Sequence, residues 1–250
     1  MKIDVWFSSA NITPPDMQGR TVVVIDVLRA TTSIVAALAN GAKAVVPAGS
    51  TEEALRIAQN LERDDVVLAG ERKSQRIPGF ALGNSPHEFA PDVVHGKTVV
   101  LTTTNGTPAL QATHGAKEVL VAAAVNFGMV VQRCRAVLAE TGELVLLCAG
   151  REKQFALEDA FAAGRLTKVL LPEGGLRRVE VNDAGIAALE LARHYGERWL
   201  RAFRASRHGR DLMDLGFRED LKMAAVEDTH PILAVYADRK VTGHRAPAAV

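Results

Sequence analysis

Short polar side chains gather where one apolar run ends, in residues 98–110, which read TVVLTTTNGTPAL. Thr107 is a good helix N-cap and Pro108 a preferred first helical residue, so a helix should begin there with its amides pointing back towards the loop. Asn105 and Gly106 are expected to adopt left-handed backbone angles, which would turn successive N–H groups inward. A capped turn needs only one Thr and one Gly. This turn contains more polar residues than that, namely Thr102 to Thr104, Asn105, Gly106 and Thr107. The surplus predicts a site for a phosphate-like anion.

A second polar turn, IDVLRATTS, follows the apolar run at residues 22–25. It places Asp26 near the carboxyl end of a strand and Arg29 in the turn, before the helix-capping residues Thr31 and Thr32. An Asp at a strand tip suits Mg²⁺, which prefers hard oxygen ligands, and the planar guanidinium of Arg suits phosphate oxygens. The alternative is an Asp–Arg pair that only braces the turn.

Further carboxylates occur at comparable places in the predicted elements. Glu71 ends the strand VVLAGER, and Glu158 and Asp159 begin the helix in QFALEDAFAAG. Acids at a helix start can simply complement the helix dipole. Together with Asp26, however, clustered carboxylates would raise one another's pKa values unless a cation lay among them. The sequence therefore predicts a metal site.

Basic residues follow Glu71 in the segment ERKSQRIPGFALGNSPHEF, residues 71–89. Arg72 and Lys73 precede a glycine-containing loop that reaches Asn84, and a capping box at residues 85–88 opens a short helix. They are interpreted as a second clamp for an anion, or as a solvated face. His208, at another helix start, has two interpretations, a general acid or a surface histidine, and the surface histidine is favoured.

The elements that must position these residues alternate along the chain. Helices are expected at about residues 51–63 and 32–39, and segment 174–210 reads as a peripheral helical layer. The strand signals are short apolar runs without a polar face, which is typical of strands covered on both sides. These runs are Val22–Val27, Ala44–Pro47, Val66–Ala69, Val99–Leu101, Val119–Ala122 and Leu144–Cys148.

This alternation predicts an α/β fold with a largely parallel sheet between helices, whose strands bring their polar turns to one edge. No linker divides residues 1–250, so a single domain is expected, with residues 245–250 as a frayed tail.

Composition limits the partners. The formal net charge of +1 argues against nucleic acid or an anionic membrane, and no apolar run approaches the roughly 20 residues of a membrane span. The start of the chain lacks a secretion-signal pattern, and its two cysteines have no CxxC spacing. We therefore expect a cytoplasmic protein with a small anionic substrate; a homodimer is left open.

Five motifs in order, spread over residues 4–228, resemble the 2-phosphosulfolactate phosphatase (ComB-like) family: IDVLRATTS, GERKSQRIPGFALGNSP, LTTTNGTPAL, CAGREKQFALEDAFAAG and HGRDLMDLGFREDL. The resemblance implies a three-layer α/β/α fold with a largely parallel or mixed sheet. It also implies Mg²⁺-dependent hydrolysis of (R)-2-phospho-3-sulfolactate to 3-sulfolactate and phosphate, a step towards coenzyme M. One departure is Lys73-Ser74-Gln75, where family members commonly have a glycine-containing stretch.

The resulting hypothesis assigns catalysis to Asp26, Arg29 and Asp159. Mg²⁺ would be held by Asp26, Glu71 and Asp159 with Glu158 nearby. The expected substrate-binding residues are Thr31, Thr32, Arg72, Lys73, Asn84, Thr103, Thr104, Asn105, Gly106 and Thr107. Direct attack by water and an aspartyl phosphate on Asp26 both remain open. So do a phosphatase for another small phosphorylated acid and a non-catalytic small-anion-binding protein.

Overall fold

A computed structural model describes residues 1–10 and 12–245. Arg245, expected in a frayed tail, instead ends a strand, and residues 246–250 lie outside the described part. The strands are β1 (Lys2–Trp6), β2 (Thr21–Ile25), β3 (Ala44–Pro47), β4 (Val66–Arg72), β5 (Gln75–Arg76), β6 (Thr98–Thr102), β7 (Glu118–Ala122), β8 (Glu143–Cys148), β9 (Glu180–Val181), β10 (Ile232–Ala237) and β11 (Lys240–Arg245).

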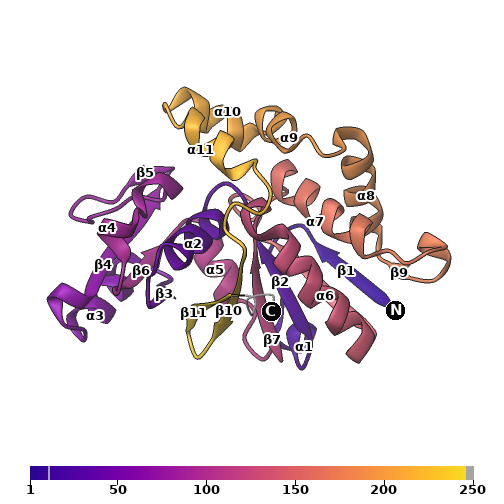
Figure 1. Cartoon of the computed structure of the whole chain (residues 1–250), viewed down its shortest axis with the longest axis horizontal. Coiled ribbons are helices and arrows are strands. Elements are labelled where there is room, and N and C mark those ends of the chain that lie inside the picture. Colours follow the sequence, from indigo (N-terminus) through magenta and orange to yellow (C-terminus); the bar gives the residue numbers. More distant parts are fainter. Residues whose placement is uncertain (11, 246–250) are drawn as a thin grey trace, which may run out of the picture.

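Helices lie between and after these strands (Figure 1). They are α1 (Pro14–Met17), α2 (Ala30–Ala39), α3 (Thr51–Gln59), α4 (Pro91–Val94), α5 (Gly106–Gln111), α6 (Phe127–Thr141), α7 (Leu157–Leu170), α8 (Asp183–Tyr195), α9 (Trp199–Ala205), α10 (Arg207–Asp214) and α11 (Arg218–Ala224). Short 3₁₀ turns cover Arg63–Asp65, Pro86–Glu88, Ala124–Asn126 and Gly175–Arg177. None of the helices in the described ranges is both long and apolar enough to span a bilayer.

The strands form one mixed sheet in the order β5-β4-β6-β3-β11-β10-β7-β2-β8-β1-β9. Two parallel blocks, β4-β6-β3 and β7-β2-β8-β1-β9, confirm the predicted parallel character. The hairpin β10–β11 joins them through antiparallel pairing with β7 on one side and β3 on the other. Neither of its strands was predicted, although β10 is a six-residue apolar run, ILAVYA. β11, KVTGHR, is mostly exposed and has no such run.

The hairpin gives the two blocks opposite senses along the sheet, so carboxyl ends do not meet at one edge as a simple parallel sheet would require. Sheets twist by roughly 20–25° per strand pair, and the four pairings between β2 and β3 therefore turn one block by about a right angle relative to the other. This rotation allows the carboxyl ends of β2, β4 and β6 to face a common hollow, which Asp26, Glu71 and Thr103 line.

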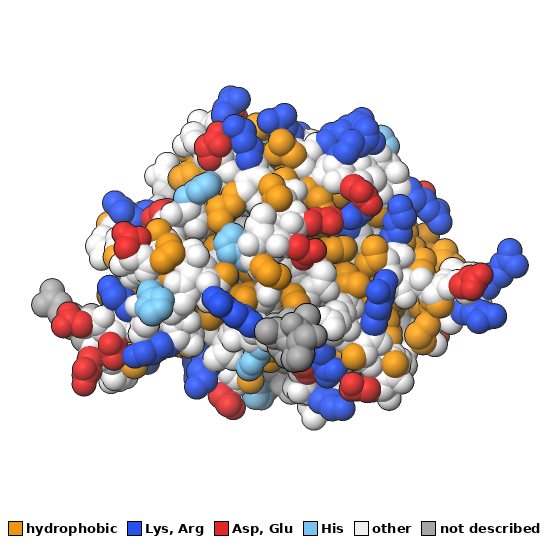
Figure 2. Space-filling view, in the orientation of Figure 1, with side chains coloured by type: hydrophobic (Ala, Val, Ile, Leu, Met, Phe, Trp, Pro, Cys, Tyr) orange, Lys and Arg blue, Asp and Glu red, His pale blue; other side chains and the backbone are white. Residues whose placement is uncertain are grey.

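Helices cover both faces of the sheet, as the apolar strand runs predicted. Val23 and Ile25 of β2 pack in one core with α6 and α7, while Val22 and Val24 pack in another with α2 and α5. This arrangement is a three-layer α/β/α fold, in which α8 lies beside α7 and contacts β1 (Figure 1). On the surface, acidic and basic side chains are interspersed over the face that Figure 2 shows.

The helix that carries Glu158 and Asp159, α7, depends on a close contact with α8. A Cβ added to Gly164 would lie 1.9 Å from the carbonyl oxygen of Ala188. The two helix backbones can therefore approach this closely only because position 164 has no side chain.

We expect Gly164→Ala to lower the free energy of unfolding by about 1–3 kcal/mol, because α8 must move away from α7. Gly128→Ala is the matched control, since its Cβ would meet only the carboxylate of Asp228, at 2.9 Å. Equilibrium urea unfolding measures both variants, and equal stabilities would contradict the proposed backbone contact.

Candidate functional site

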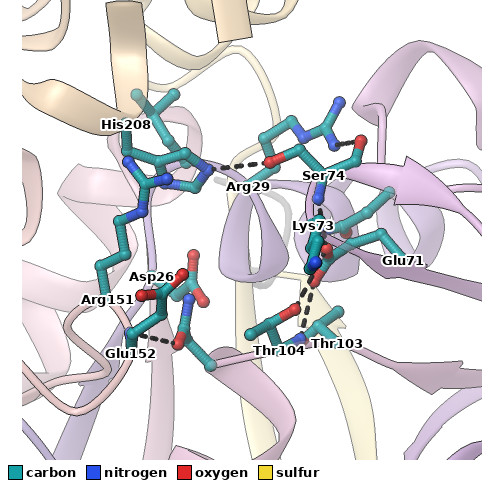
Figure 3. Close-up of a pocket in the computed structure, with 13 residues that line it drawn as sticks. Asp26, Arg29, Glu71, Lys73, Ser74, Thr103, Thr104, Arg151, Glu152 and His208 are labelled. Carbon is teal, nitrogen blue, oxygen red and sulfur yellow. Dashed lines mark hydrogen bonds between the residues drawn. The ribbon is translucent and has the colours of Figure 1, made fainter. Parts of the chain in front are cut away.

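A hollow lies where loops after β2, β4, β6 and β8 meet the amino-terminal end of α10 (Figure 3). Polar and charged side chains dominate its lining, and several of them belong to the sequence-predicted site. The lining residues are Asp26, Leu28, Arg29, Glu71, Lys73, Ser74, Asn84, Thr103, Thr104, Asn105, Arg151, Glu152 and His208.

Asp26 lies directly after β2 and is 6% exposed. Its Oδ1 accepts a hydrogen bond from the amide of Ala30 at 3.2 Å. Burial raises the pKa of Asp26 to about 6; the positive charge of His208 and the Ala30 amide oppose this, while Glu71 and Glu158 add to it. Asp26 is therefore a carboxyl group whose charge is costly unless a cation is nearby.

Gly106 permits the loop after β6 to approach Asp26. A Cβ at this position would lie 2.4 Å from the Cβ of Ala30 and 2.7 Å from Oδ2 of Asp26. The expected left-handed conformation is wrong: Asn105 has a φ of −125°, and Gly106 is absent from the described residues with positive φ. The glycine is needed for space rather than for a backbone nest.

The helix after this loop, α5, begins at Gly106 with Asn105 as its N-cap, two residues before the predicted N-cap Thr107. Thr107 is instead paired with Thr103: each backbone amide donates to the other's hydroxyl at 3.0 Å. This reciprocal bonding fixes the loop shape. Thr103 lines the hollow, whereas Thr107 supports it from behind.

Glu71 joins two segments of the hollow. Its Oε1 accepts from the amide of Thr104 at 2.6 Å, and its Oε2 accepts from the amide of Ser74 at 2.7 Å. Lys73 and Ser74 have φ values of 52° and 66°, so they form a tight left-handed turn between β4 and β5. Arg72 points elsewhere, with Nη2 donating to Thr102 Oγ1 at 3.0 Å.

The hydroxyls of Thr31 and Thr32 are used within their own turn. They donate to the carbonyls of Asp26 and Val27, each at 2.8 Å. Both threonines are fully buried, and neither lines the hollow. In this structure they shape the end of β2 and the start of α2.

Arg29 is 3% exposed and lines the hollow with its charge already paired. Its Nη1 lies 2.7 Å from Oδ2 of Asp220, and its Nη2 donates to the carbonyl of Ser74 at 2.8 Å. The guanidinium stacks over the ring of Phe217 at 4.3 Å. Asp220 was not predicted as a site residue, because in the sequence it is simply an acidic residue near the start of a helix.

Glu158 and Asp159 begin α7 as predicted but do not line this hollow. Asp159 accepts from the amides of Val27 at 3.0 Å and Gly150 at 3.2 Å, so it ties the loop after β2 to the loop after β8. Burial, with the charges of Asp26 and Glu158, raises the pKa of Asp159 well above its usual value.

His208 contacts Glu158 and overlooks the hollow from α10. Its Nδ1 lies 3.3 Å from Glu158 Oε1, and its side chain is 14% exposed. The favoured interpretation as a surface histidine is therefore wrong. His208 also borders a second hollow of about 320 Å³, shared with Arg151 and lined by Glu158 and Phe155. Arg151 was likewise missed, because nothing in its local sequence indicates that it faces a site.

The oxygen atoms around the first hollow suit Mg²⁺ in kind. Asp26 and Glu71 supply carboxylates, and Asn84 Oδ1 is buried with no hydrogen-bond partner among the described residues. Mg²⁺ is usually bound by one or two protein carboxylates, with water and substrate phosphate completing its shell. Among residues 1–10 and 12–245, no three His, Cys, Asp or Glu side chains form a ready metal cage.

Comparisons with known proteins point to one family. The family model for 2-phosphosulpholactate phosphatase matches residues 7–239. A protein of Symbiobacterium thermophilum named "Probable 2-phosphosulfolactate phosphatase" is 41% identical over 92% of this chain and 97% of its own length. A protein of Caldanaerobacter subterraneus subsp. tengcongensis with the same name is 39% identical over 93% and 94% of the two chains.

A third relative, from Deinococcus radiodurans, carries that name at 41% identity over 84% of this chain and 85% of its own. The match of the family model extends over the ends of β2, β4, β6 and β8 and over α10, so it includes every segment that lines the hollow. The chain belongs to the 2-phosphosulpholactate phosphatase family, whose members are phosphoric monoester hydrolases.

Proposed function

We propose that this protein hydrolyses the phosphate ester of 2-phospho-3-sulfolactate to 3-sulfolactate and phosphate, with Mg²⁺ as cofactor. The observation that carries the proposal is that the buried carboxylates of Asp26 and Glu71 line one hollow together with Arg29 and the threonines of the loop after β6. The family membership and the names of the relatives support the substrate. A role in making coenzyme M is part of the same proposal.

Asp26 and Glu71 would hold the ion, with the orphaned oxygen of Asn84 as a further ligand. When bound, Mg²⁺ supplies positive charge that stabilises the phosphoryl oxygens and orients the attacking water. Asp159 positions Asp26 through the loop after β2, because it holds the amide of Val27. Burial raises the pKa of Asp26 to about 6, so its ionised form is costly without a cation.

The phosphoryl group would bind between Arg29 and the loop at residues 103–105. Arg29 is held by Asp220 and Phe217, so its guanidinium is fixed before the substrate arrives. The hydroxyl of Thr103 accepts from the Thr107 amide, which leaves its own proton for a phosphate oxygen. Lys73 stands at the rim and would meet the sulfonate or carboxylate.

Hydrolysis can proceed by direct attack of water or through an aspartyl phosphate on Asp26. A non-catalytic anion carrier is the weaker alternative, because buried carboxylates oppose the binding of an anion unless a cation accompanies it.

We expect the wild-type protein to release phosphate from 2-phosphosulfolactate, and EDTA to abolish that release until Mg²⁺ is added back. The screen should include 2-phospholactate, phosphoglycerate and an aryl phosphate, because a preference for the sulfonate tests the substrate assignment. Phosphate is measured colorimetrically. Release from none of the esters would contradict the proposed function, and release that resists EDTA would contradict the metal.

Asp26→Asn tests the charge at the proposed metal site without relying on activity. Because the pKa of Asp26 is raised from 3.8 to about 6, the ionised carboxylate destabilises metal-free protein, and this cost appears as the pH rises through that range. In EDTA, the variant should be more stable than wild type at about pH 7 by up to roughly 3 kcal/mol, and the gap should close near pH 4.

Adding Mg²⁺ at neutral pH should then stabilise the wild-type protein more than Asp26→Asn, because only the wild type keeps the carboxylate. Urea unfolding with and without Mg²⁺ measures the difference. An equal response of both proteins to Mg²⁺ would argue against Asp26 as a ligand.

Gly106→Ala should lower kcat/KM by roughly 100-fold, because the new Cβ would displace Asp26 and a misplacement of about 1 Å can cost that much. Gly49→Ala is a matched control whose Cβ would meet the side-chain oxygen of Gln111, at 2.7 Å, away from the hollow. Steady-state kinetics measure kcat/KM of both variants, and circular dichroism verifies that they are folded. Full activity of Gly106→Ala would refute the proposed need for space at position 106.

A further inference from the structure

His208 is held over the hollow by its position in α10. The N-cap of that helix, Ser206, accepts a hydrogen bond from the amide of Gly209 at 2.9 Å, which fixes the first turn. A side chain at Gly209 would overlap the carbonyl of Phe203, so the turn packs closely on α9. The imidazole is thus carried by a rigid turn and faces the hollow (Figure 3).

The two nitrogens of the ring have different surroundings. Nδ1 lies 3.3 Å from Oε1 of Glu158, whose side chain is only 3% exposed. Nε2 points towards the hollow, where Ser74 Oγ lies 3.5 Å away, at the long limit of a hydrogen bond. The Glu158 carboxylate at Nδ1 orients the ring with Nε2 towards the site. In the imidazolium form both ring nitrogens are donors, so Nε2 then carries a proton aimed into the site.

Hydrolysis of 2-phosphosulfolactate needs such a proton. The leaving group is the alkoxide of a secondary alcohol, which is a strong base and departs slowly unless it is protonated as the bond breaks. Of the other groups in the hollow, Arg29 does not release protons and is paired with Asp220. Both oxygens of Glu71 accept backbone amides, so this carboxyl group is held as an acceptor.

We propose that His208 is the general acid that protonates the ester oxygen, and that Glu158 is its positioning residue. This inference rests on the proposed function and assigns a catalytic role to residues outside the Asp26–Glu71 pair. As the bond between phosphorus and the ester oxygen breaks, its electron pair moves to that oxygen, which takes the proton from Nε2 and leaves as the alcohol. The attacking oxygen forms the new bond to phosphorus. The proton that water loses passes to solvent, from which His208 is protonated again.

Proton donation matters for a basic leaving group and little for one that is stable as an anion. We therefore compare His208→Gln on 2-phosphosulfolactate and on p-nitrophenyl phosphate, with Mg²⁺ present. General acid catalysis is typically worth about 100- to 10,000-fold, so kcat on the alkyl ester should fall by at least about 100-fold while the aryl ester loses less than about tenfold. Glu158→Gln should show the same pattern with smaller losses.

His194→Gln is the matched control, because His194 is an exposed histidine on α8. It should leave the rates on both esters unchanged. The ratio of the two rates is measured on a single preparation, so a partly unfolded variant does not alter it. Equal losses on both esters in His208→Gln would overturn the general acid while leaving the proposed function intact. No release from either ester by the wild-type protein would overturn both.

A measurement on the unaltered protein covers the case in which a variant does not fold or the aryl ester is not turned over. With oxygen-18 in the bridging position of 2-phosphosulfolactate, the isotope effect on kcat/KM should be small, because protonation compensates for the breaking bond. A large normal effect, as for an unprotonated alkoxide, would overturn the assignment. Phosphate release with no detectable oxygen-18 isotope effect from the bridging position would support the assignment of His208 as the general acid.

Discussion

Buried carboxylates at the ends of β2 and β4 and at the start of α7 are the constraint around which this structure is organised. Asp26, Glu71, Glu158 and Asp159 are each less than a tenth exposed, and ionised acids in such surroundings are costly unless they find donors or cations. Three of them contact donors of the protein: Glu71 and Asp159 accept backbone amides, and Glu158 contacts His208. The amides do not fully compensate Asp159, whose pKa stays well above its usual value. Among the described residues, the side chain of Asp26 accepts one amide hydrogen bond, from Ala30, and Asp26 lines the hollow, where an external cation can reach it.

The same hydrogen bonds also shape the site. Glu71 holds the β4–β5 turn against the loop after β6, and Asp159 holds the loop after β2 against the loop after β8. Arg29 and Asp220 add α11 to this network. Each loop is therefore positioned by an acid from another segment, and removing one acid disturbs two walls of the hollow. Electrostatic compensation and geometry are supplied by the same side chains.

Local signals in the sequence were sufficient for β2, β3, β4, β6, β7 and β8, because each of these strands contains a short apolar run. Ala44–Pro47 coincides with β3, and the acids of QFALEDAFAAG begin α7 as predicted. What the sequence could not supply were relations between distant segments. His208 meets Glu158 only because α10 folds over the start of α7, and the role of Gly106 follows from an approach to α2 rather than from its own φ angle. The position of the hairpin β10–β11 between β7 and β3 likewise depends on pairing with distant segments, although β10 itself is an apolar run.

That hairpin has a consequence for how the molecule is assembled. β10 and β11 follow all the other described strands in the chain, yet they lie between the two parallel blocks of the sheet. During synthesis both blocks emerge before the segment that links them, and pairings across such long sequence separations form slowly. Asp26 and Glu71, which belong to different blocks, therefore acquire their final spacing only when the hairpin docks. Catalytic competence would be among the last properties that a newly made chain gains.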